Sequence, residues 1–384
     1  MRHENSVFHS LTKHIAWTKF EQLVERHGSD YRVRRLDSKG QFLAMLFAQL
    51  SGASSLREIE AGLASHAGHL YHLGAKRAAR STLADANTNR SSALFEDLFA
   101  EMAATASRQT RRRLADVTRI LDATRIELSS LHRDWAVSCN GKWATKLHVE
   151  YDPGGALPLT AGMTPETVND ITPAKALEPE PGATYIFDLA YYDFAWWAKL
   201  DALGCRIVTR LKRHTQLQVL AELAVPDDSD IVSDRIGLLP QGQRGSRRNP
   251  FCDPVREITV RISTGKLIRV LTNDLDAPAD EIAGLYKQRW QIELFFKWIK
   301  QNLKIKHFLG TSENAVRTQI FIALIAYIVL RIAQATQSSV KQPLAFARLI
   351  RLNLMHRRPI DNLTNAFNPP PRDTTQMNLE LVQC

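Results

Sequence analysis

The chain has 384 residues, which is long enough for roughly two or three domains with a sizeable buried core. Its 50 lysine and arginine residues outnumber its 40 aspartate and glutamate residues, giving a formal net charge of +10 and a pI of about 9.5. This balance favours a polyanionic partner, although many basic proteins that bind no nucleic acid share it. The four cysteines lie far apart and form no C-x-x-C pair, which argues against a zinc ribbon or a disulfide scaffold and favours a reducing cytoplasm.

The sequence shows no segment typical of secretion or membrane insertion. Its N-terminus lacks the apolar stretch of a signal peptide. The longest uncharged apolar run, residues 320–330, is bracketed by Arg317 and Arg331 and is shorter than the ~20 residues of a membrane-spanning helix. We therefore predict a buried core helix at this position and no association with a membrane.

Residues 1–107 show apolar side chains at helical spacing and little of the alternation that marks strands. Ser54 or Ser55 could cap a helix, with Glu58 three residues after Ser55 in capping-box position, and a Gly- and His-rich break follows at residues 67–74. A second helix after this break would complete a helix-turn-helix arrangement that reads DNA. Its candidate contact residues, which can bond to bases or phosphates, are Arg77, Arg80, Asn87 and Arg90. A plain helical bundle with a solvated basic face explains the pattern equally well.

After a basic segment, the hydrophobic pattern changes to the alternation of strands. A strand with Asp122 is followed by two strands joined by a turn at residues 152–155, and then by a helix, a strand ending at Asp188, another helix and a strand. This order is the layout of an RNase H-like core, and it places both aspartates at strand ends facing one cleft. Two other aspartates have simpler explanations, because Asp116 precedes the best strand and Asp193 is in the N-cap position of a helix.

We predict a mixed α+β fold divided into five parts. A good hairpin pattern around Gly265 indicates that strands dominate the region before the last core helix. The parts are an α-helical DNA-binding region at 1–107, the first part of the RNase H-like core at 114–211, a β-rich insertion at 212–280, the second part of the core at 281–335, and a helical or irregular tail at 336–384.

The stretch 286–300, Y-K-Q-R-W-Q-I-E-L-F-F-K-W-I-K, sorts its polar and apolar residues in an unusual way. At ~100° per residue its main polar side chains fall in one arc roughly 80° wide. An ordinary surface helix has a broader polar face, so this pattern indicates a helix that is buried on most sides and forms the wall of a cleft. The residues of the arc are Tyr286, Arg289, Glu293, Lys297 and Lys300. A single carboxylate among cations suits a Mg²⁺ ion bound beside a polyanion.

The spacing Tyr-x2-Arg-x3-Glu-x6-Lys in this stretch resembles the Tyr-Arg-Glu-Lys signature of the bacterial insertion-sequence transposases called the IS-four family. The segment I-L-D-A-T around Asp122 is similar to the first-aspartate motif of that family, and I-F-D-L-A-Y-Y around Asp188 is similar to the second. In the second motif A-Y-Y stands where G-Y is frequent. The resemblance covers about residues 118–309.

The resemblance implies a DNA transposase that acts by cut-and-paste. Its catalytic carboxylates, which would also hold two Mg²⁺ ions with Mn²⁺ as a possible substitute, are Asp122, Asp188 and Glu293. The residues implied to contact DNA near the cleaved phosphate are Tyr286, Arg289 and Lys300, with Lys297 added from the same arc. The implied partner is double-stranded DNA, both the terminal inverted repeats and the target, bound by a homodimer in the bacterial cytoplasm at the nucleoid.

Two other functions stay open on the sequence alone. An inactive transposase copy could act as a DNA-binding repressor, although the intact triad argues against it. An RNase H-fold nuclease that cuts without joining ends would have the same residues, and only its products would differ. His148 could contact DNA or metal, but a histidine at a strand end is more often structural.

Overall fold

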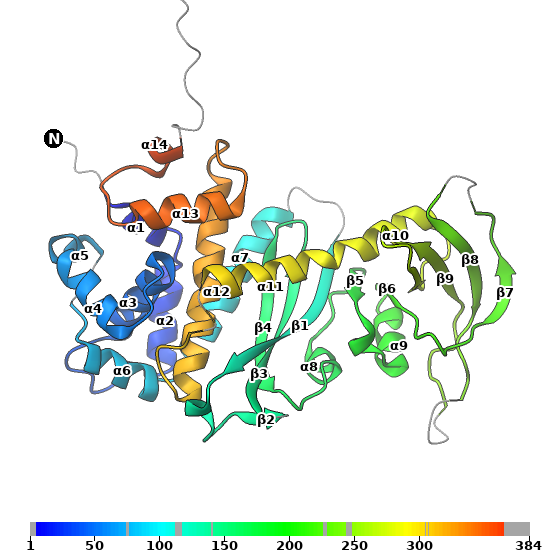
Figure 1. Ribbon diagram of the computed structural model, residues 1–384, viewed down its shortest axis with the longest axis horizontal. Coiled ribbons are helices and arrows are strands. Elements are labelled where there is room, and N and C mark those ends of the chain that lie inside the picture. Colours follow the sequence, from blue (N-terminus) through cyan, green and yellow to red (C-terminus); the bar gives the residue numbers. More distant parts are fainter. Residues whose placement is uncertain are drawn as a thin grey trace, which may run out of the picture.

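The computed structural model describes residues 5–73, 77–111, 117–139, 141–225, 229–242, 248–303, 305 and 307–364. Its first part consists of helices, as predicted. These are α1 (Val7–Thr12), α2 (Trp17–Arg26), α3 (Ser38–Ser51), α4 (Leu56–Ser65), α5 (Ala67–Leu73), α6 (Arg80–Asn89) and α7 (Ala93–Arg111). Together they form one end of the elongated molecule in Figure 1.

Local sequence signals explain how some of these helices begin. Ser55 caps α4 as predicted, because its hydroxyl accepts a hydrogen bond from the backbone N–H of Glu58 at 3.2 Å. The Glu58 carboxylate accepts one in turn from the backbone N–H of Ser54 at 2.8 Å, one residue earlier than in a standard capping box. The break predicted at 67–74 is instead the short helix α5, and α7 continues to Arg111, past the boundary predicted at 107.

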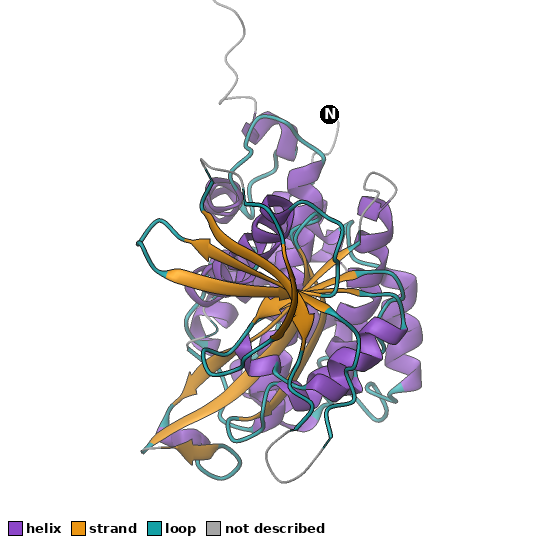
Figure 2. Cartoon of the chain, turned by 90° about the vertical axis from the view of Figure 1, so that its right-hand side faces the viewer, coloured by secondary structure: helices purple, strands orange, loops and turns teal. Residues whose placement is uncertain are grey.

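Ten strands form one mixed sheet in the described part of the chain. They are β1 (Thr118–Leu128), β2 (Val137–Cys139), β3 (Lys142–Asp152), β4 (Leu157–Pro165), β5 (Thr184–Phe187), β6 (Arg206–Arg210), β7 (Gln218–Glu222), β8 (Ile231–Leu238), β9 (Val255–Arg261) and β10 (Leu267–Thr272). Their order is β2-β3-β1-β5-β6-β10-β9-β8-β7, with β4 also paired to β3. Figure 2 shows the pronounced twist of this sheet, whose strands fan out about one axis.

The first strands have the connectivity of an RNase H-like core. β1, β3 and β4 pair antiparallel in turn, while β5 and β6 run parallel to β1. Helices α8 (Ile171–Ala176) and α9 (Phe194–Ala202) connect β4 to β5 and β5 to β6. Trp196 and Trp197 of α9 are buried beside Phe187, as expected for core residues. The predicted mixed α+β fold with an RNase H-like core is therefore confirmed.

The predicted β-rich insertion does not form a sheet of its own. β10 pairs antiparallel with β6, so β7 to β10 extend the core sheet. The predicted hairpin is present between β9 and β10, with Gly265 at a φ of +79°. Alternation in a sequence indicates strands, but it does not say which unpaired strand edge they will join.

The apolar run at 320–330 belongs to α12 (Glu313–Ala335), which lies at the centre of the molecule (Figure 1). It packs against α3, α6, α7 and β4, so the helical region and the sheet share one hydrophobic core. By length and composition α12 is apolar enough to cross a membrane, but most of it is buried inside the protein, as predicted for a core helix.

The chain after α12 returns to the N-terminal helices. α13 (Pro343–Asn353) packs on α3, and α14 (Ile360–Thr364) follows it. Between them, the backbone carbonyl of His356 accepts a hydrogen bond from the N–H of Val7 at 3.0 Å. The predicted tail therefore closes over the start of the chain as far as Thr364, and residues 365–384 lie outside the described part.

Candidate active site

Strand register places the two aspartates of the predicted triad side by side. β1 and β5 are parallel, and their last paired residues are Leu121 and Phe187. The next residues are Asp122 and Asp188, and neighbouring strands lie only about 5 Å apart. Asp188 follows the end of β5 as predicted. Asp122 does not end its strand, because β3 continues to pair with β1 as far as Leu128.

Backbone N–H groups orient both carboxylates. Asp122 accepts a hydrogen bond from the N–H of Ala123 at 2.8 Å. Asp188 caps the short 3₁₀ turn η2 (Leu189–Tyr191) and accepts a hydrogen bond from the N–H of Ala190 at 2.8 Å. Tyr191 of the same turn is buried in the core. The A-Y-Y sequence therefore forms a local turn that holds Asp188 at the end of β5.

Glu293 comes from α11 (Trp290–Asn302), which follows α10 (Ala279–Gln288) almost without interruption. Figure 1 shows the two helices as one long run beside the sheet. The predicted helix at 286–300 is thus two segments, and the backbone tightens at Arg289 because its N–H bonds to the carbonyl three residues earlier. Trp290 and Leu294 are 57% and 51% exposed, so the helix is less buried than its sequence pattern indicated.

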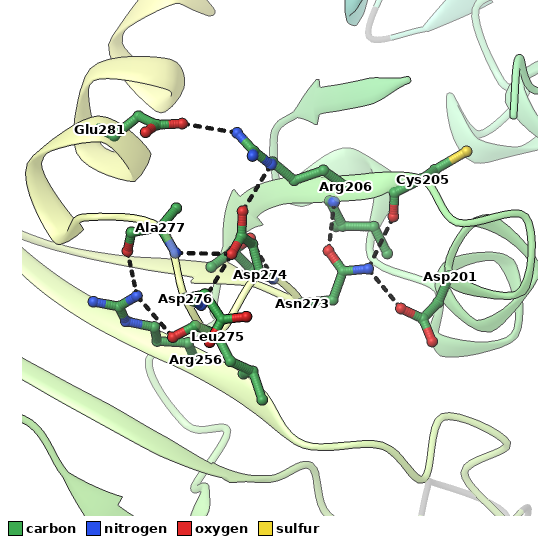
Figure 3. A network of polar contacts seen from close by, with 12 residues as sticks. Asp201, Cys205, Arg206, Arg256, Asn273, Asp274, Leu275, Asp276, Ala277 and Glu281 are labelled. Carbon is green, nitrogen blue, oxygen red and sulfur yellow. Dashed lines mark hydrogen bonds and ion pairs between the residues drawn. The ribbon is translucent and has the colours of Figure 1, made fainter. Parts of the chain in front are cut away.

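Polar contacts fix the start of α10 to the sheet (Figure 3). Arg206 of β6 lies 2.9 Å from a carboxylate oxygen of Asp274 and also donates to Glu281 of α10 at 2.9 Å. Arg256 of β9 donates to the backbone carbonyl of Ala277, in the loop before α10, at 2.5 Å. The inserted strands therefore determine where the helical run of the site begins.

The three predicted carboxylates line one open cavity of about 540 Å³. Its main polar side chains come from β1, from the turn after β5 and from the α10–α11 run, and they are Asp122, Thr124, Asp188, Arg289, Glu293 and Lys300. Since a water molecule takes up about 30 Å³ in the liquid, this volume has room for hydrated cations and a phosphate group.

Arg289 and Lys300 supply positive charge inside the cavity. Nη2 of Arg289 donates to Oε1 of Glu293 at 2.6 Å, and Nη1 lies 3.7 Å from Oδ2 of Asp122. The Lys300 ammonium donates to the hydroxyl of Thr124 at 2.5 Å. Thr124 was not among the residues predicted from the sequence. Its position two residues after Asp122 could have indicated it, because alternate residues of a strand share one face.

The surroundings of Asp122 disfavour the charged form of its carboxyl group. Burial, together with the nearby carboxylates of Asp188 and Glu293, raises the pKa of Asp122 from 3.8 to about 7. The N–H of Ala123 and the guanidinium of Arg289 oppose this shift without cancelling it. A carboxyl with a strongly shifted pKa in a cavity is typical of a functional site, and a bound cation would favour its charged form.

Known proteins with similar sequences identify the reaction class. Residues 113–329, more than half of the chain, match the family described as "Transposase DDE domain". The chain belongs to this DDE transposase family. A Sinorhizobium fredii protein named as a transposase, y4zB, is 40% identical over 293 residues, which cover 75% of this chain and 80% of that protein. A Geobacillus stearothermophilus protein named as the transposase of insertion sequence element IS5377 is 30% identical over 274 residues, covering 70% of this chain and 71% of that protein.

Two more matches extend beyond the DDE domain. Residues 3–76 match a "Domain of unknown function (DUF4372)". The cryo-EM structure of the piggyBac transposase synaptic complex with hairpin DNA aligns with a TM-score of 0.45 and 9% identity, covering 96% of this chain and 82% of that chain. By its DDE domain and its relatives the protein is a bacterial insertion-sequence transposase, an enzyme that cleaves DNA and transfers its strands.

Two further residues of the predicted arc lie at or beside the cavity. The ring of Tyr286 lies 5.9 Å from the guanidinium carbon of Arg289, and burial raises the pKa of its phenol. Lys297 is exposed and lines the cavity. Their contacts with DNA stay predictions.

Two of the four residues predicted to read DNA, Asn87 of α6 and Arg90 just after it, form hydrogen bonds within the helical region. Asn87 is 2% exposed, and its side-chain oxygen accepts a hydrogen bond from Gln41 at 2.9 Å. Arg90 donates to the side-chain oxygen of Gln41 at 3.1 Å and to the backbone carbonyl of Leu36. This corrects the prediction for Asn87, because α6 packs on α3, α4 and α12 and buries that side chain. Arg90 is half-buried, and its contact with DNA stays a prediction.

The remaining candidates fall into three groups. Arg77 and Arg80 are exposed and stay predicted DNA contacts. His148 is buried, shares a hydrogen bond with the hydroxyl of Thr164 at 2.7 Å and lines a separate, smaller cavity, which favours the structural interpretation. Asp193 caps α9 as predicted. The alternative aspartate at position 116 lies outside the described residues.

The donor chemistry of the cavity fits the divalent cations on which DDE transposase domains depend. Carboxylate oxygens are the ligands that Mg²⁺ prefers, and a bound cation would offset the burial and the neighbouring carboxylates that raise the pKa of Asp122. Within the described ranges, no three acidic, histidine or cysteine side chains are close enough together to hold an ion. The Glu293 carboxylate is instead bonded to Arg289.

Proposed function

We propose that this transposase cleaves DNA at the terminal inverted repeats of an insertion sequence and joins the freed ends to target DNA, in a cut-and-paste reaction. The observation that carries the proposal is the convergence of Asp122, Asp188 and Glu293, from three separate elements, on one cavity that also contains Arg289 and Lys300. Carboxylates and cations in one open cavity suit the cleavage of a phosphodiester, whose reacting group is anionic.

The three carboxylates would hold two Mg²⁺ ions, with Mn²⁺ able to take their place. When bound, such ions lower the pKa of the attacking hydroxyl and stabilise the leaving oxygen. For Glu293 to act with the aspartates, its carboxylate has to leave Arg289. The guanidinium is then free to hold the phosphate by two parallel hydrogen bonds. Arg289 would thus exchange a carboxylate of the protein for a phosphate of the DNA.

Three more residues would contact the DNA strand beside the cleaved phosphate. Lys300 reaches the cavity floor, where the hydroxyl of Thr124 holds its ammonium near the aspartates. Lys297 is exposed along the same helix and would meet the next phosphate. Tyr286 lies against Arg289 and would steady its guanidinium while its hydroxyl contacts the strand.

The partner would be double-stranded DNA, both at the element ends and at the target. The formal net charge of +10 supports a polyanionic partner. Because two element ends have to be held together for joining, we assign a homodimer on DNA. The site of action would be the bacterial cytoplasm, at the nucleoid.

The test is excision in cells of a marked element bounded by the DNA that naturally flanks this reading frame. Wild type would be compared with Glu293→Gln and with Asp280→Asn, a matched control that is exposed on the same helical run and lies outside the cavity. We expect excision by wild type and by the control, none by Glu293→Gln, and end binding by all three. Excision by Glu293→Gln would refute the assignment.

Cleavage of a labelled end duplex in vitro tests the cations and the products. We expect cleavage with Mg²⁺ or Mn²⁺ and none with a chelator. Joining of the cut end to a second duplex would separate a transposase from a nuclease that only cuts. If wild type and the variants all bind the end duplex and none of them cleaves it, the chain is an inactive transposase copy that binds DNA.

A further inference from the structure

The loop between α2 and α3, residues 27–37, presents a cluster of exposed arginines beside an exposed aromatic ring. Tyr31 is 74% exposed, one of the most exposed large side chains in the described part of the chain. Arg32, Arg34 and Arg35 are also exposed and place three positive charges within four residues. This loop lies inside the region that matches the domain of unknown function, and the sequence reasoning did not single it out.

The acidic residues of this loop are hydrogen-bonded at the start of α3 and form no ion pair with the arginines of the tip in the described part of the chain. Asp30 accepts hydrogen bonds from the N–H and the hydroxyl of Ser38 at 2.7 and 2.8 Å. Asp37 caps α3 and accepts one from the N–H of Gly40 at 2.7 Å. Both carboxylates are therefore used at the start of α3, where the positive end of the helix dipole also favours them.

The arginines at the tip have no ion-pair partner among the described residues. By contrast, Arg26, just before the loop, donates to a carboxylate oxygen of Asp97 at 2.6 Å. The guanidinium of Arg32 lies 5.0 Å from the centre of the Tyr31 ring. The positive charge of the tip is thus available to a partner outside the chain.

The loop is held in one shape at both ends. Within it, the N–H of Tyr31 bonds to the carbonyl of Gly28 at 3.0 Å, and Arg32 has a φ of +58°, which is uncommon for a residue other than glycine. At its far end Arg90 donates to the backbone carbonyl of Leu36. Arg90 follows the last residue of α6, so this contact attaches the loop to the end of that helix.

We propose that Tyr31, Arg32, Arg34 and Arg35 bind the sugar-phosphate backbone of the duplex at the element end. The arginines would contact phosphates, and the tyrosine ring would pack against a sugar. The preformed loop would lose little conformational freedom on binding, which favours affinity. This inference rests on the proposed function, because the element end is its ligand.

Two charge-matched variants test the loop. The first is Arg32→Ala/Arg34→Ala/Arg35→Ala in the full-length protein, and the control is Arg133→Ala/Arg261→Ala/Arg358→Ala, which removes the same charge from exposed positions elsewhere. The probe is a duplex copied from the DNA that flanks this reading frame, titrated by fluorescence anisotropy over a range of salt concentrations. We expect affinity to fall by about 10- to 100-fold in the loop variant, and the slope of log K against log salt to flatten by about 2 to 3.

The control variant should lose much less affinity and keep most of the slope. A scrambled duplex of the same length should show a similar loss in the loop variant, because phosphates carry no sequence information. Equal losses in loop and control variants, or an unchanged slope in the loop variant, would overturn the inference. If circular dichroism shows that the triple variant does not fold, the double variant Arg34→Ala/Arg35→Ala replaces it. This variant keeps Arg32, whose φ is positive, and should flatten the slope by about 1 to 2.

Binding and cleavage are measured separately, so the two proposals can fail separately. A loop variant that binds like wild type, while wild-type cleavage depends on Glu293, would remove only the loop inference. Loop-dependent binding by a wild-type protein that does not cleave would remove only the proposed reaction. In addition, Tyr31→Ala should weaken binding without changing the salt slope, because its contact is not ionic.

Discussion

Two groups of ionised side chains in this transposase are treated in opposite ways by the fold. In the inserted strands, Arg256 and Asp234 are 6% and 3% exposed and form a bidentate pair, with N–O distances of 2.8 and 2.7 Å. In the cavity, Arg289 faces the carboxylates of Asp122 and Glu293, with Asp188 beside them, and the pKa of Asp122 is raised to about 7. The first pair satisfies its charges by hydrogen bonds, whereas in the second group burial and neighbouring carboxylates disfavour the charged form of Asp122.

The difference separates charges that stabilise the fold from charges that are kept for the reaction. A buried pair that satisfies its hydrogen bonds holds strands and loops in place, and breaking it leaves an isolated charge in the core. Carboxylates that repel one another cost stability, and proteins keep such groups where function requires them. Arg256 belongs to the structural ion pair and also donates to the backbone carbonyl of Ala277, in the loop before α10. The structural ion pair is therefore connected to the helical run that carries Glu293.

Glu293→Gln should give the largest effect, and it acts on activity alone. Cleavage of an end duplex should fall to the level of the chelator control, because an amide cannot replace a carboxylate as a cation ligand. The free energy of unfolding should change by less than about 1 kcal/mol, since the side chain is 35% exposed. Urea denaturation measures this, and a loss of several kcal/mol would place Glu293 with the structural charges.

Arg256→Ala should give the opposite result. Removing the guanidinium leaves Asp234 buried without its partner, so the free energy of unfolding should fall by about 3–5 kcal/mol. Arg235→Ala is the control, because its pair with Glu222 is largely exposed and should contribute less than about 1 kcal/mol. If urea denaturation gives both variants the same loss in the free energy of unfolding, the buried pair contributes no more to stability than the exposed one.

Asp122→Asn should stabilise the protein at high pH in the absence of divalent cations. A raised pKa in the folded state means that wild type is most stable, with respect to this group, below pH 4 and loses that stability as pH rises towards 7. The variant lacks this loss, so at pH 8 it should be more stable than wild type by about 1–4 kcal/mol. Denaturation at pH 5 and pH 8 should show the gap widening with pH, and a constant gap would contradict the assigned cause.

Thr124→Val should give the smallest effect. It removes the hydroxyl that holds Lys300 but keeps the size of the side chain. We expect the cleavage rate to fall by about tenfold, because a hydrogen bond to a charged group contributes about 1.5–3 kcal/mol and the ammonium can find other partners. Thr124→Ser should restore the rate. Cleavage kinetics would measure both, and failure of serine to restore the rate would show that the hydroxyl is not what matters.

Much of the catalytic half was predictable from the sequence. The order of strands and helices predicted the RNase H-like core, and the helix caps at Ser55 and Asp193 formed as expected. The predicted carboxylates Asp122, Asp188 and Glu293 line one cavity. These features depend on hydrophobic period, capping chemistry and spacing along the chain, all of which act over a few residues.

Other features depend on contacts between segments that are far apart in the sequence. The sequence by itself determined that strands follow β6, but pairing with the edge of β6 made them part of the core sheet and let Arg206 and Arg256 hold the start of α10. It determined that α6 is a helix, but packing on α3, α4 and α12 decided that Asn87 is buried. Periodicity describes a helix or strand without its neighbours, whereas burial and charge compensation depend on which neighbour covers each face.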